Sequence, residues 1–323
     1  MTATLVLPGT APEADWHAAR RNGITASEIA VLMGLSPYGS PFELYHRKLG
    51  NLPETEDNDA MAIGRHMESW VAAKFAERHP EFTVTGDGRA LFAHPDRPWQ
   101  MATPDRLIED TATCGITERD GIFEVEHLAV LECKVDAGNP DWGEDGSDQI
   151  PVHYRCQVLW QCDVLGVTAW YLALLDWMRR RIRIYRGVID EAAGADLRIM
   201  RAEAEAFLRR VAAGDPPDVD WRPATTSALK RLHPSLDDTE IRVPMTLARK
   251  YQAACTSLKA AEQRKKLAEN KLRDRLGSGR RVLDALGRPV ARRDVYDLPE
   301  KTIIRKATTV DRLVAVKPKE DSQ

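Results

Sequence analysis

Apolar residues recur along this chain in two spacings, one typical of helices and one typical of strands. Residues 61–78 carry apolar side chains every three or four positions, which places them on one face of a helix: Met67, Trp70, Val71 and Phe75. Residues 180–188 alternate isoleucine with arginine, which predicts a strand exposed on one side. The short apolar run 128–134 (LAVLECK) is typical of a strand buried within a sheet.

Capping and turn signals divide the rest of the first two hundred residues into short elements. Thr25 with Glu28, and Ser40 with Glu43, match two capping boxes that begin helices, the first ending near Gly34 and the second at Gly50. The other expected elements are helices near 15–21, 152–165 and 190–213 and strands near 90–94, 99–103, 121–125 and 168–176. Residues 1–12 are expected to be disordered, and 51–59 and 136–151 to form polar loops. Helices mixed with short strands in this way predict an α/β fold.

The pattern changes after Trp221. Residues 245–276 predict one long charged helix, and 280–296 predict a β-hairpin that turns at LGRP. We therefore expect two domains, an α/β domain over 1–222 and a helical and hairpin C-terminal extension over 223–323. The long helix is polar on most faces and has little to gain from its own burial.

Composition and charge limit the classes of protein to which this chain could belong. The chain is 43% hydrophobic and 29% charged, and no apolar run approaches the length of a membrane span, so we expect a cytoplasmic protein with no membrane contact. The net charge of −3 hides an asymmetry, because residues 1–150 carry −14 and residues 151–323 carry +11. The basic half could contact nucleic-acid phosphates, or both halves could simply have solvated charged faces.

Asp105, Glu132 and Lys134 carry the candidate chemistry. Glu132 and Lys134 point to the same side of the predicted strand, where a charge is costly to bury without a partner. Asp105 follows Pro104 and arrives from a neighbouring element, so two carboxylates could hold a hard divalent cation beside a lysine that positions water. Taken singly, an Asp after a proline such as Asp105 is most often a turn residue, and a pair such as Glu132 and Lys134 is more often a surface pair on an edge strand.

Four further segments accompany these residues in a characteristic order: 16–28 (WHAARRNGITASE), 64–69 (GRHMES), 154–161 (YRCQVLWQ) and 170–176 (WYLALLD). Over about residues 15–215 the chain resembles the lambda-type exonuclease and YqaJ-like viral recombinase family of the PD-(D/E)XK nuclease superfamily. The resemblance implies a restriction-endonuclease-like core with a mixed central sheet flanked by helices. It also implies a magnesium-dependent exonuclease that degrades one strand of duplex DNA from the 5′ end.

The resemblance assigns roles residue by residue. The residues it implies for catalysis are Glu68, Asp105, Glu132, Lys134 and Gln157. Asp105 and Glu132 would hold Mg²⁺, with Mn²⁺ as a substitute and two ions in the site. Arg20 and Ser27 would bind the terminal 5′ phosphate, and a helix beginning next to Ser27 favours an anion there.

The resemblance also implies partners and a setting. The enzyme would act on double-stranded DNA ends as a homo-oligomeric ring, such as a trimer, and leave 3′ overhangs for a single-strand annealing protein. The setting would be phage or prophage recombination in the cytoplasm of a bacterial host. Two alternatives remain open, a structure-specific endonuclease or repair nuclease on the same core, and a non-enzymatic DNA-binding or assembly protein. The Arg20 and Ser27 pair argues against the first, and the intact Asp105, Glu132 and Lys134 set argues against the second.

The resemblance assigns no catalytic or binding role to three aromatic residues and one basic run. Trp160, Trp170 and Tyr171 are expected to be core residues rather than base-stacking platforms. The run 179–186 (RRRIRIYR) could follow a DNA backbone, but its pattern favours a solvent-facing strand edge that arginine keeps soluble.

Overall fold

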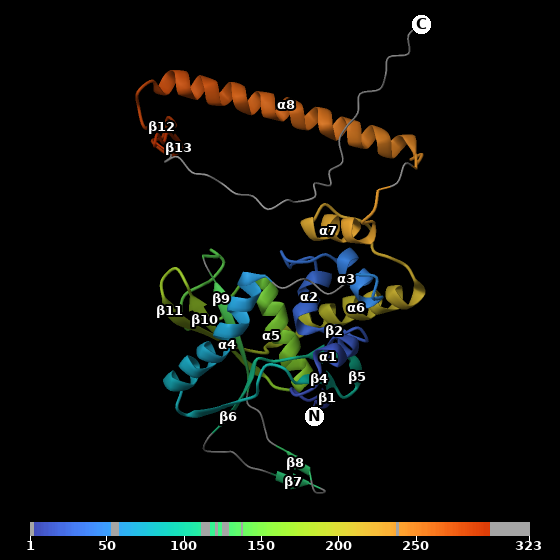
Figure 1. The fold of residues 1–323 in the computed structure, drawn as a ribbon. Helices are drawn as coiled ribbons and strands as arrows, with labels where there is room; N and C mark the ends of the chain where they lie inside the picture. The colour runs from blue at the N-terminus through green and yellow to red at the C-terminus, as the bar shows by residue number, and fades with distance from the viewer. Residues whose placement is uncertain are drawn as a thin grey trace. The chain divides into compact units, whose positions relative to one another are not determined.

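The computed structural model describes residues 3–52, 58–110, 117–119, 122–124, 129–136, 138–236 and 239–297. It divides into two compact units, Met1–Pro234 and Ser235–Gln323. The elements of the first unit, in chain order (Figure 1), are β1 (Thr4–Leu7), α1 (Glu13–Arg20), β2 (Ile24–Thr25), α2 (Ala26–Leu32), α3 (Pro41–Lys48), α4 (Asp59–Arg78), β3 (Phe82–Thr85), β4 (Leu91–His94), β5 (Arg97–Ala102), β6 (Arg106–Asp110), β7 (Thr117–Arg119), β8 (Ile122–Glu124), β9 (Ala129–Asp136), α5 (Val152–Leu165), β10 (Ala169–Asp176), β11 (Arg181–Val188), α6 (Glu191–Ala213) and α7 (Pro223–Leu232). Those of the second are α8 (Met245–Leu276), β12 (Arg281–Leu283) and β13 (Pro289–Arg292).

The first unit is built on two mixed sheets. The larger has the strand order β11-β10-β9-β6-β3, with β9 and β10 parallel and the other neighbours antiparallel. The smaller has the order β1-β4-β5-β2, in which β2 and β5 are parallel. The predicted α/β class, with mixed sheets and helices, is confirmed.

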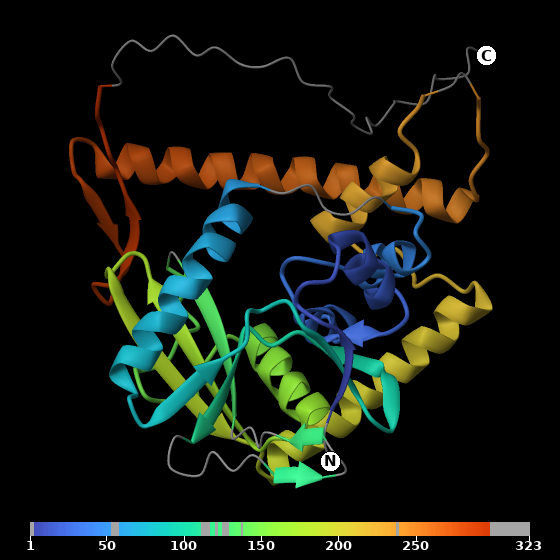
Figure 2. The same cartoon turned by 60° about the horizontal axis from the view of Figure 1, so that its bottom comes forward.

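Helix α5 lies between the two sheets and contacts β4 and β5 of one and β9 and β10 of the other. Figure 2 shows it in the middle of the unit, with α4 outside the larger sheet. The Trp160 side chain at the centre of α5 is fully buried, and its indole N–H lies 3.3 Å from the Ile24 carbonyl and 3.2 Å from the Met101 carbonyl. One tryptophan therefore ties α5 to both β2 and β5.

The alternation of β9 decides which side chains reach α5. Leu131 and Cys133 pack with Val71 and Phe75 of α4 on one face of the sheet. Glu132 and Lys134 therefore point to the opposite face, toward α5. The parallel register sets Glu132 beside Leu172 and Lys134 beside Leu174.

Both predicted capping boxes mark real helix starts. The Thr25 amide donates to Glu28 Oε2 at 2.9 Å, and the Glu43 amide donates to Ser40 Oγ at 3.1 Å. Glu28 has a second role, because Lys48 Nζ donates to the same oxygen at 2.8 Å and ties α3 to α2. Burial alone would raise the pKa of Glu28, but Lys48, Arg20 and Arg47 together hold it at about 2.

Three sequence predictions need correction or completion. The disorder predicted for residues 1–12 was wrong, because Thr4–Leu7 form strand β1 beside β4. The chain divides after Pro234 rather than after 222, because α7 packs on α3 and buries Ala228 against Phe42 and Leu52. The predicted strand near 121–125 contains β8, and residues 53–57 of the predicted acidic loop lie outside the described residues.

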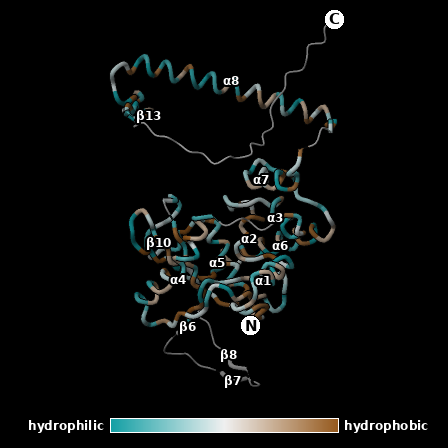
Figure 3. Tube along the Cα trace, viewed as in Figure 1, coloured by the Kyte–Doolittle hydropathy of each residue, from teal (hydrophilic) through white to brown (hydrophobic). Residues whose placement is uncertain are grey.

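The second unit follows the sequence pattern closely. Helix α8 has the predicted bounds, none of its residues is buried, and its trace is largely hydrophilic (Figure 3). The β12–β13 hairpin turns at the predicted LGRP sequence. Within the described ranges, no helix combines the length and the hydropathy that crossing a bilayer requires.

The buried Glu28 carboxylate should make stability depend on acidity. Because its folded pKa lies below the ordinary value of 4.5, the charged Glu28 stabilises the fold above about pH 4.5, and this contribution disappears as the pH falls toward about 2. The size of that shift corresponds to about 3 kcal/mol. We expect Glu28→Gln to lower the free energy of unfolding by about that amount at pH 7.

Urea denaturation followed by tryptophan fluorescence measures this effect in the first unit alone, because all eight tryptophans lie before residue 222. The wild-type and variant curves should converge as the pH is lowered from 4.5 toward 2. A difference that stays constant over this range would contradict the role given to the Glu28 charge.

Helix α7 should be part of the folded first unit. A chain ending after Pro234 should keep the wild-type urea midpoint, because the described contacts of α7 are retained. A chain ending after Ala224 loses Ala228 and uncovers Phe42 and Leu52, so we expect a loss of roughly 1–3 kcal/mol in the free energy of unfolding. Equal midpoints for the two truncated chains would remove this role for α7.

Candidate active site

The Glu132 carboxylate is the centre of the site. It is 1% exposed and lies on the face of β9 that meets α5. Gln157 Nε2 donates to its Oε1 at 2.5 Å, and Gln161 Nε2 donates to its Oε2 at 2.7 Å. Gln157 and Gln161 are four residues apart on one face of α5, so a single helix face orients both carboxylate oxygens.

Lys134 completes this group. Its Nζ pairs with Glu132 Oε1 and lies 5.1 Å from the centre of the Tyr154 ring, a cation–π distance. Burial alone would lower the pKa of Lys134, but Glu132 and Asp105 more than offset it and raise the pKa above its ordinary value. Burial raises the pKa of Tyr154 to about 12. The lysine is therefore a fixed ammonium group at neutral pH.

Asp105 reaches the same place from the loop between β5 and β6. Its Oδ2 accepts a hydrogen bond of 2.7 Å from the Cys133 amide, between Glu132 and Lys134 on β9. Burial, and after it the Glu132 charge, raises the pKa of the Asp105 carboxyl well above its usual range. Two carboxyl groups are thus held together in a buried place, where a second negative charge is disfavoured.

Glu68 approaches from α4 through Arg106. Arg106 Nη1 donates to Glu68 Oε1 at 2.7 Å and also to the Asp105 carbonyl. Gly88, whose φ is +73°, lies against this carboxylate, and a Cβ there would come within 2.5 Å of Glu68 Oε1. Glu68 therefore lies next to Asp105, with an arginine between α4 and the site.

Asp105 and Glu132 fit a hard divalent cation. A cation would supply the positive charge that two buried carboxylates need, and carboxylate oxygens are the donors that Mg²⁺ prefers. Magnesium keeps several waters and commonly takes only one or two carboxylates from the protein. In the described part of the chain no group of three or more His, Cys, Asp or Glu side chains has metal-binding geometry, so the fit rests on this pair.

Arg20 and Ser27, the predicted phosphate-binding residues, are brought together. Arg20 Nη2 donates to Thr25 Oγ1 at 3.0 Å and to Ser27 Oγ at 3.2 Å. The Arg20 guanidinium lies 4.2 Å from the centre of the Trp16 ring, one helical turn earlier. Stacking and hydrogen bonding thus hold the guanidinium in one position.

One cavity connects the two groups. It has a volume of about 770 Å³, and its walls include Arg20, Ser27, Glu68, Asp105, Lys134, Tyr154 and Gln157. Glu132 lies behind this wall, buried beneath Lys134 and Gln157. The structure therefore brings the predicted site residues to the wall of a single cavity, with Glu132 directly behind that wall.

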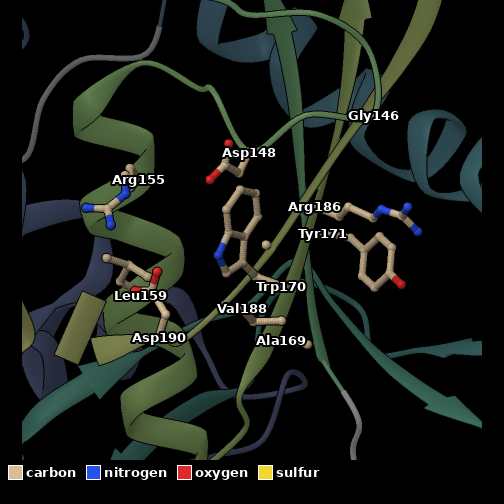
Figure 4. Close-up of a pocket in the computed structure, with 11 residues that line it drawn as sticks. Gly146, Asp148, Arg155, Leu159, Ala169, Trp170, Tyr171, Arg186, Val188 and Asp190 are labelled. Carbon is tan, nitrogen blue, oxygen red and sulfur yellow. The ribbon is translucent and has the colours of Figure 1, made fainter. Parts of the chain in front are cut away.

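A second cavity, of about 540 Å³, lies near the start of β10 and is lined by none of the predicted catalytic residues. Figure 4 shows Trp170 in its centre, between Arg155 of α5 and Arg186 of β11. Trp170 is 2% exposed, and the Tyr171 ring packs against Phe75 at 5.4 Å. The prediction that Trp160, Trp170 and Tyr171 are core residues agrees with this packing.

The solvent-facing edge predicted for β11 was wrong at Arg183. Arg183 is 6% exposed and donates to the Gly143 carbonyl. The Ile184 amide donates to Asp145 at 2.7 Å, and the Arg186 amide donates to the Ser147 carbonyl at 3.2 Å. The loop after β9 therefore covers this edge of β11. This contact joins distant segments, and the local sequence pattern does not predict it.

Two residues of the site were missed in the sequence. Gln161 was not assigned a role, although its spacing of four residues from Gln157 placed it on the same helix face. Arg106 directly follows Asp105, and only the approach of α4 reveals that it holds Glu68. The first could have been found from helical spacing, and the second could not.

Known protein sequences match a large part of this chain. Residues 15–168 match the family model of the YqaJ-like viral recombinase domain. The chain is 27% identical over 231 residues to the uncharacterized protein YqaJ of Bacillus subtilis (strain 168), and the alignment covers 70% of this chain and 65% of the length of that relative.

Solved structures of an alkaline exonuclease, LHK-Exo from Laribacter hongkongensis, align with 62% of this chain and 94% of theirs. The first has 22% identity and a TM-score of 0.45, and the complex with dAMP has 21% and 0.44. The family predicted from the sequence is confirmed by the family model, whose matched segment includes Arg20, Asp105, Glu132 and Lys134. Residues 15–168 of this chain therefore match the YqaJ-like viral recombinase domain that the sequence motifs predict.

Proposed function

We propose that this protein is a magnesium-dependent exonuclease that degrades one strand of linear duplex DNA from the 5′ end and leaves 3′ overhangs. One observation carries the proposal, namely that the Arg20 and Ser27 group and the Asp105, Glu132 and Lys134 group line or border one cavity of about 770 Å³. A phosphate-binding group beside a hydrolytic group suits an enzyme that begins at a DNA end.

The residues of the site have separable tasks in this proposal. Bound Mg²⁺ would supply a water of lowered pKa and neutralise charge on the phosphate. Asp105 and Glu132 would hold the cation, and Gln157 and Gln161 orient Glu132. Lys134 would position the attacking water and, as a fixed ammonium, stabilise the negative charge that develops on the phosphate. Glu68, held by Arg106, adds a third carboxylate beside Asp105.

The Arg20 group would bind the terminal phosphate. A guanidinium presents donors in a fixed fork that matches two phosphate oxygens. Trp16, Thr25 and Ser27 already hold this fork in place, so little side-chain entropy is lost on binding.

The wider setting belongs to the same proposal. We place the enzyme in the cytoplasm of a bacterial host, encoded by a phage or prophage, as a homo-oligomeric ring that supplies a single-strand annealing protein. The family match supports this setting. Helix α8 carries nine Lys and Arg against three Asp and Glu, and this supports backbone contacts by the second unit. The chain ending after Pro234 would then bind duplex more weakly, with a smaller dependence on salt.

The metal group can be tested by single substitutions. Asp105→Asn, Glu132→Gln and Lys134→Ala should each reduce digestion of end-labelled duplex in Mg²⁺ by several orders of magnitude, and a chelator should reproduce their effect on the wild type. Removing one of two buried like charges relieves their repulsion, so Asp105→Asn should not lower the urea midpoint. Robust digestion by Asp105→Asn in Mg²⁺ would contradict the assignment.

The phosphate group can be tested with two kinds of DNA end. A charge-assisted guanidinium–phosphate contact contributes roughly 1.5–3 kcal/mol, so wild-type protein should digest 5′-phosphorylated duplex about one to two orders of magnitude faster than 5′-hydroxyl duplex. Arg20→Ala should remove most of that preference, and Ser27→Ala a smaller part. Arg21→Ala is the matched control, since Arg21 is exposed and outside the cavity wall.

Initial rates on the two linear substrates and on closed circular duplex decide between the remaining functions. Equal slowing of both end types by Arg20→Ala would make Arg20 a general DNA contact. Cleavage of closed circles by the wild type would favour an endonuclease instead.

A further inference from the structure

Arg47 and Lys48, at the end of α3, are charged residues beside the cavity to which neither the sequence nor the comparisons assign a role. Arg47 lines the same cavity as Arg20 and Ser27, and its side chain is 29% exposed. The Lys48 side chain is 2% exposed and lies behind it. Both converge on the Glu28 carboxylate, whose side chain is 7% exposed.

The two carboxylate oxygens of Glu28 have different partners at different distances. Oε2 accepts from Lys48 Nζ at 2.8 Å and from the Thr25 amide at 2.9 Å, both ordinary hydrogen-bond distances. Oε1 lies 3.4 Å from Arg47 Nη2 and 3.9 Å from Arg20 Nη2. These two distances are long for charge-assisted hydrogen bonds, which are normally about 2.7–2.9 Å. Glu28 therefore pairs most closely with Lys48 and holds the two guanidinium groups near each other.

Lys48 also fixes the position from which Arg20 extends. Its Nζ donates to the Arg20 carbonyl at 2.7 Å, one of the last carbonyl groups of α1. Carbonyl groups at a helix end have no partner within the helix, and a lysine is a suitable donor for them. The buried Glu28–Lys48 ion pair thus contacts the end of α1 as well as joining α3 to α2.

The cluster places three cationic side chains, Arg20, Arg47 and Lys48, around the Glu28 carboxylate, and the two arginines line the cavity. A terminal phosphate carries about −1.5 to −2 charges at neutral pH, whereas a phosphodiester within the strand carries about −1. Two adjacent guanidinium groups therefore match a terminal phosphate monoester better than an internal phosphodiester.

We propose that Arg47 is a second phosphate-binding residue, which acts with Arg20 on the terminal 5′ phosphate of DNA, and that the buried Glu28–Lys48 ion pair positions both guanidinium groups. The inference rests on the proposed function, because it names how the cavity recognises the 5′ end. Arg47 contacts the ligand directly, while Glu28 and Lys48 act through the two arginines.

The test measures binding without cleavage. Full-length protein in a chelator is titrated against 3′-fluorescein-labelled duplex with 5′-phosphate or 5′-hydroxyl ends, and anisotropy gives the ratio of the two dissociation constants. We expect Arg47→Ala to reduce the preference for the phosphorylated end about tenfold, with little change for the hydroxyl end. Arg47→Lys, which keeps the charge but not the fork, should recover part of it. Arg21→Ala should leave the preference unchanged.

The positioning role is tested with both charges removed together, since Lys48→Met alone would leave Glu28 buried without its ammonium. The double variant Glu28→Gln, Lys48→Met keeps Arg20 and Arg47 but no longer holds them. We expect it to lose the phosphate preference at least as strongly as Arg47→Ala. Tryptophan fluorescence in urea reports the fold of the first unit in each variant.

Each outcome decides the inference. A preference that Arg47→Ala leaves intact, or an equal loss on both ends, would overturn the terminal-phosphate role of Arg47. A folded double variant with the wild-type preference would overturn the positioning role of Glu28 and Lys48. If the wild type fails to digest duplex in Mg²⁺, the nuclease proposal fails, and binding in chelator still decides whether this wall recognises a terminal phosphate.

Discussion

The buried Glu132 carboxylate constrains the rest of the first unit. A carboxylate on the middle strand of a sheet is costly to bury, so its surroundings must supply donors and positive charge from several elements. Gln157 and Gln161 can reach Glu132 only if α5 runs across this face of β9. Lys134 can reach it only if the side chains of β9 continue to alternate between the two faces past Cys133. The position of α5 between two sheets is therefore a chemical requirement of the site as well as a packing solution.

The sequence was informative where periodicity and chemistry agree. The run around Glu132 identified both a buried strand and two polar residues on one face of it, because the strand period is two residues. The spacing of Gln157 on its helix, and the capping box at Thr25 and Glu28, were equally local signals. The bounds of α8 could be predicted for the same reason, since a long polar helix depends mainly on local propensity.

Features that depend on distant contacts could not be found this way. The capping box predicts a local role for Glu28, but it does not predict that Lys48, twenty residues later, pairs with the same carboxylate. The burial of Arg183 depends on a loop that covers the edge of β11, and α7 belongs to the first unit because of an apolar contact with α3. In each case the deciding interaction joins segments that only the folded chain brings together.

The hydrogen bond from the Cys133 amide to Asp105 makes the candidate site depend on how strands β6 and β9 pair. The pairing of β6 with β9 begins with Arg106 opposite Leu131. Just beyond this pair, the Asp105 side chain accepts a hydrogen bond from the Cys133 amide of β9. The carboxylate thus reaches its place through the register of two strands whose contact spans 28 residues of chain. A slip of β6 by one residue would reverse the side-chain faces and carry Asp105 out of the site. The candidate site therefore depends on the correctly paired sheet, and a chain with mispaired strands would lack the proposed means to cut DNA.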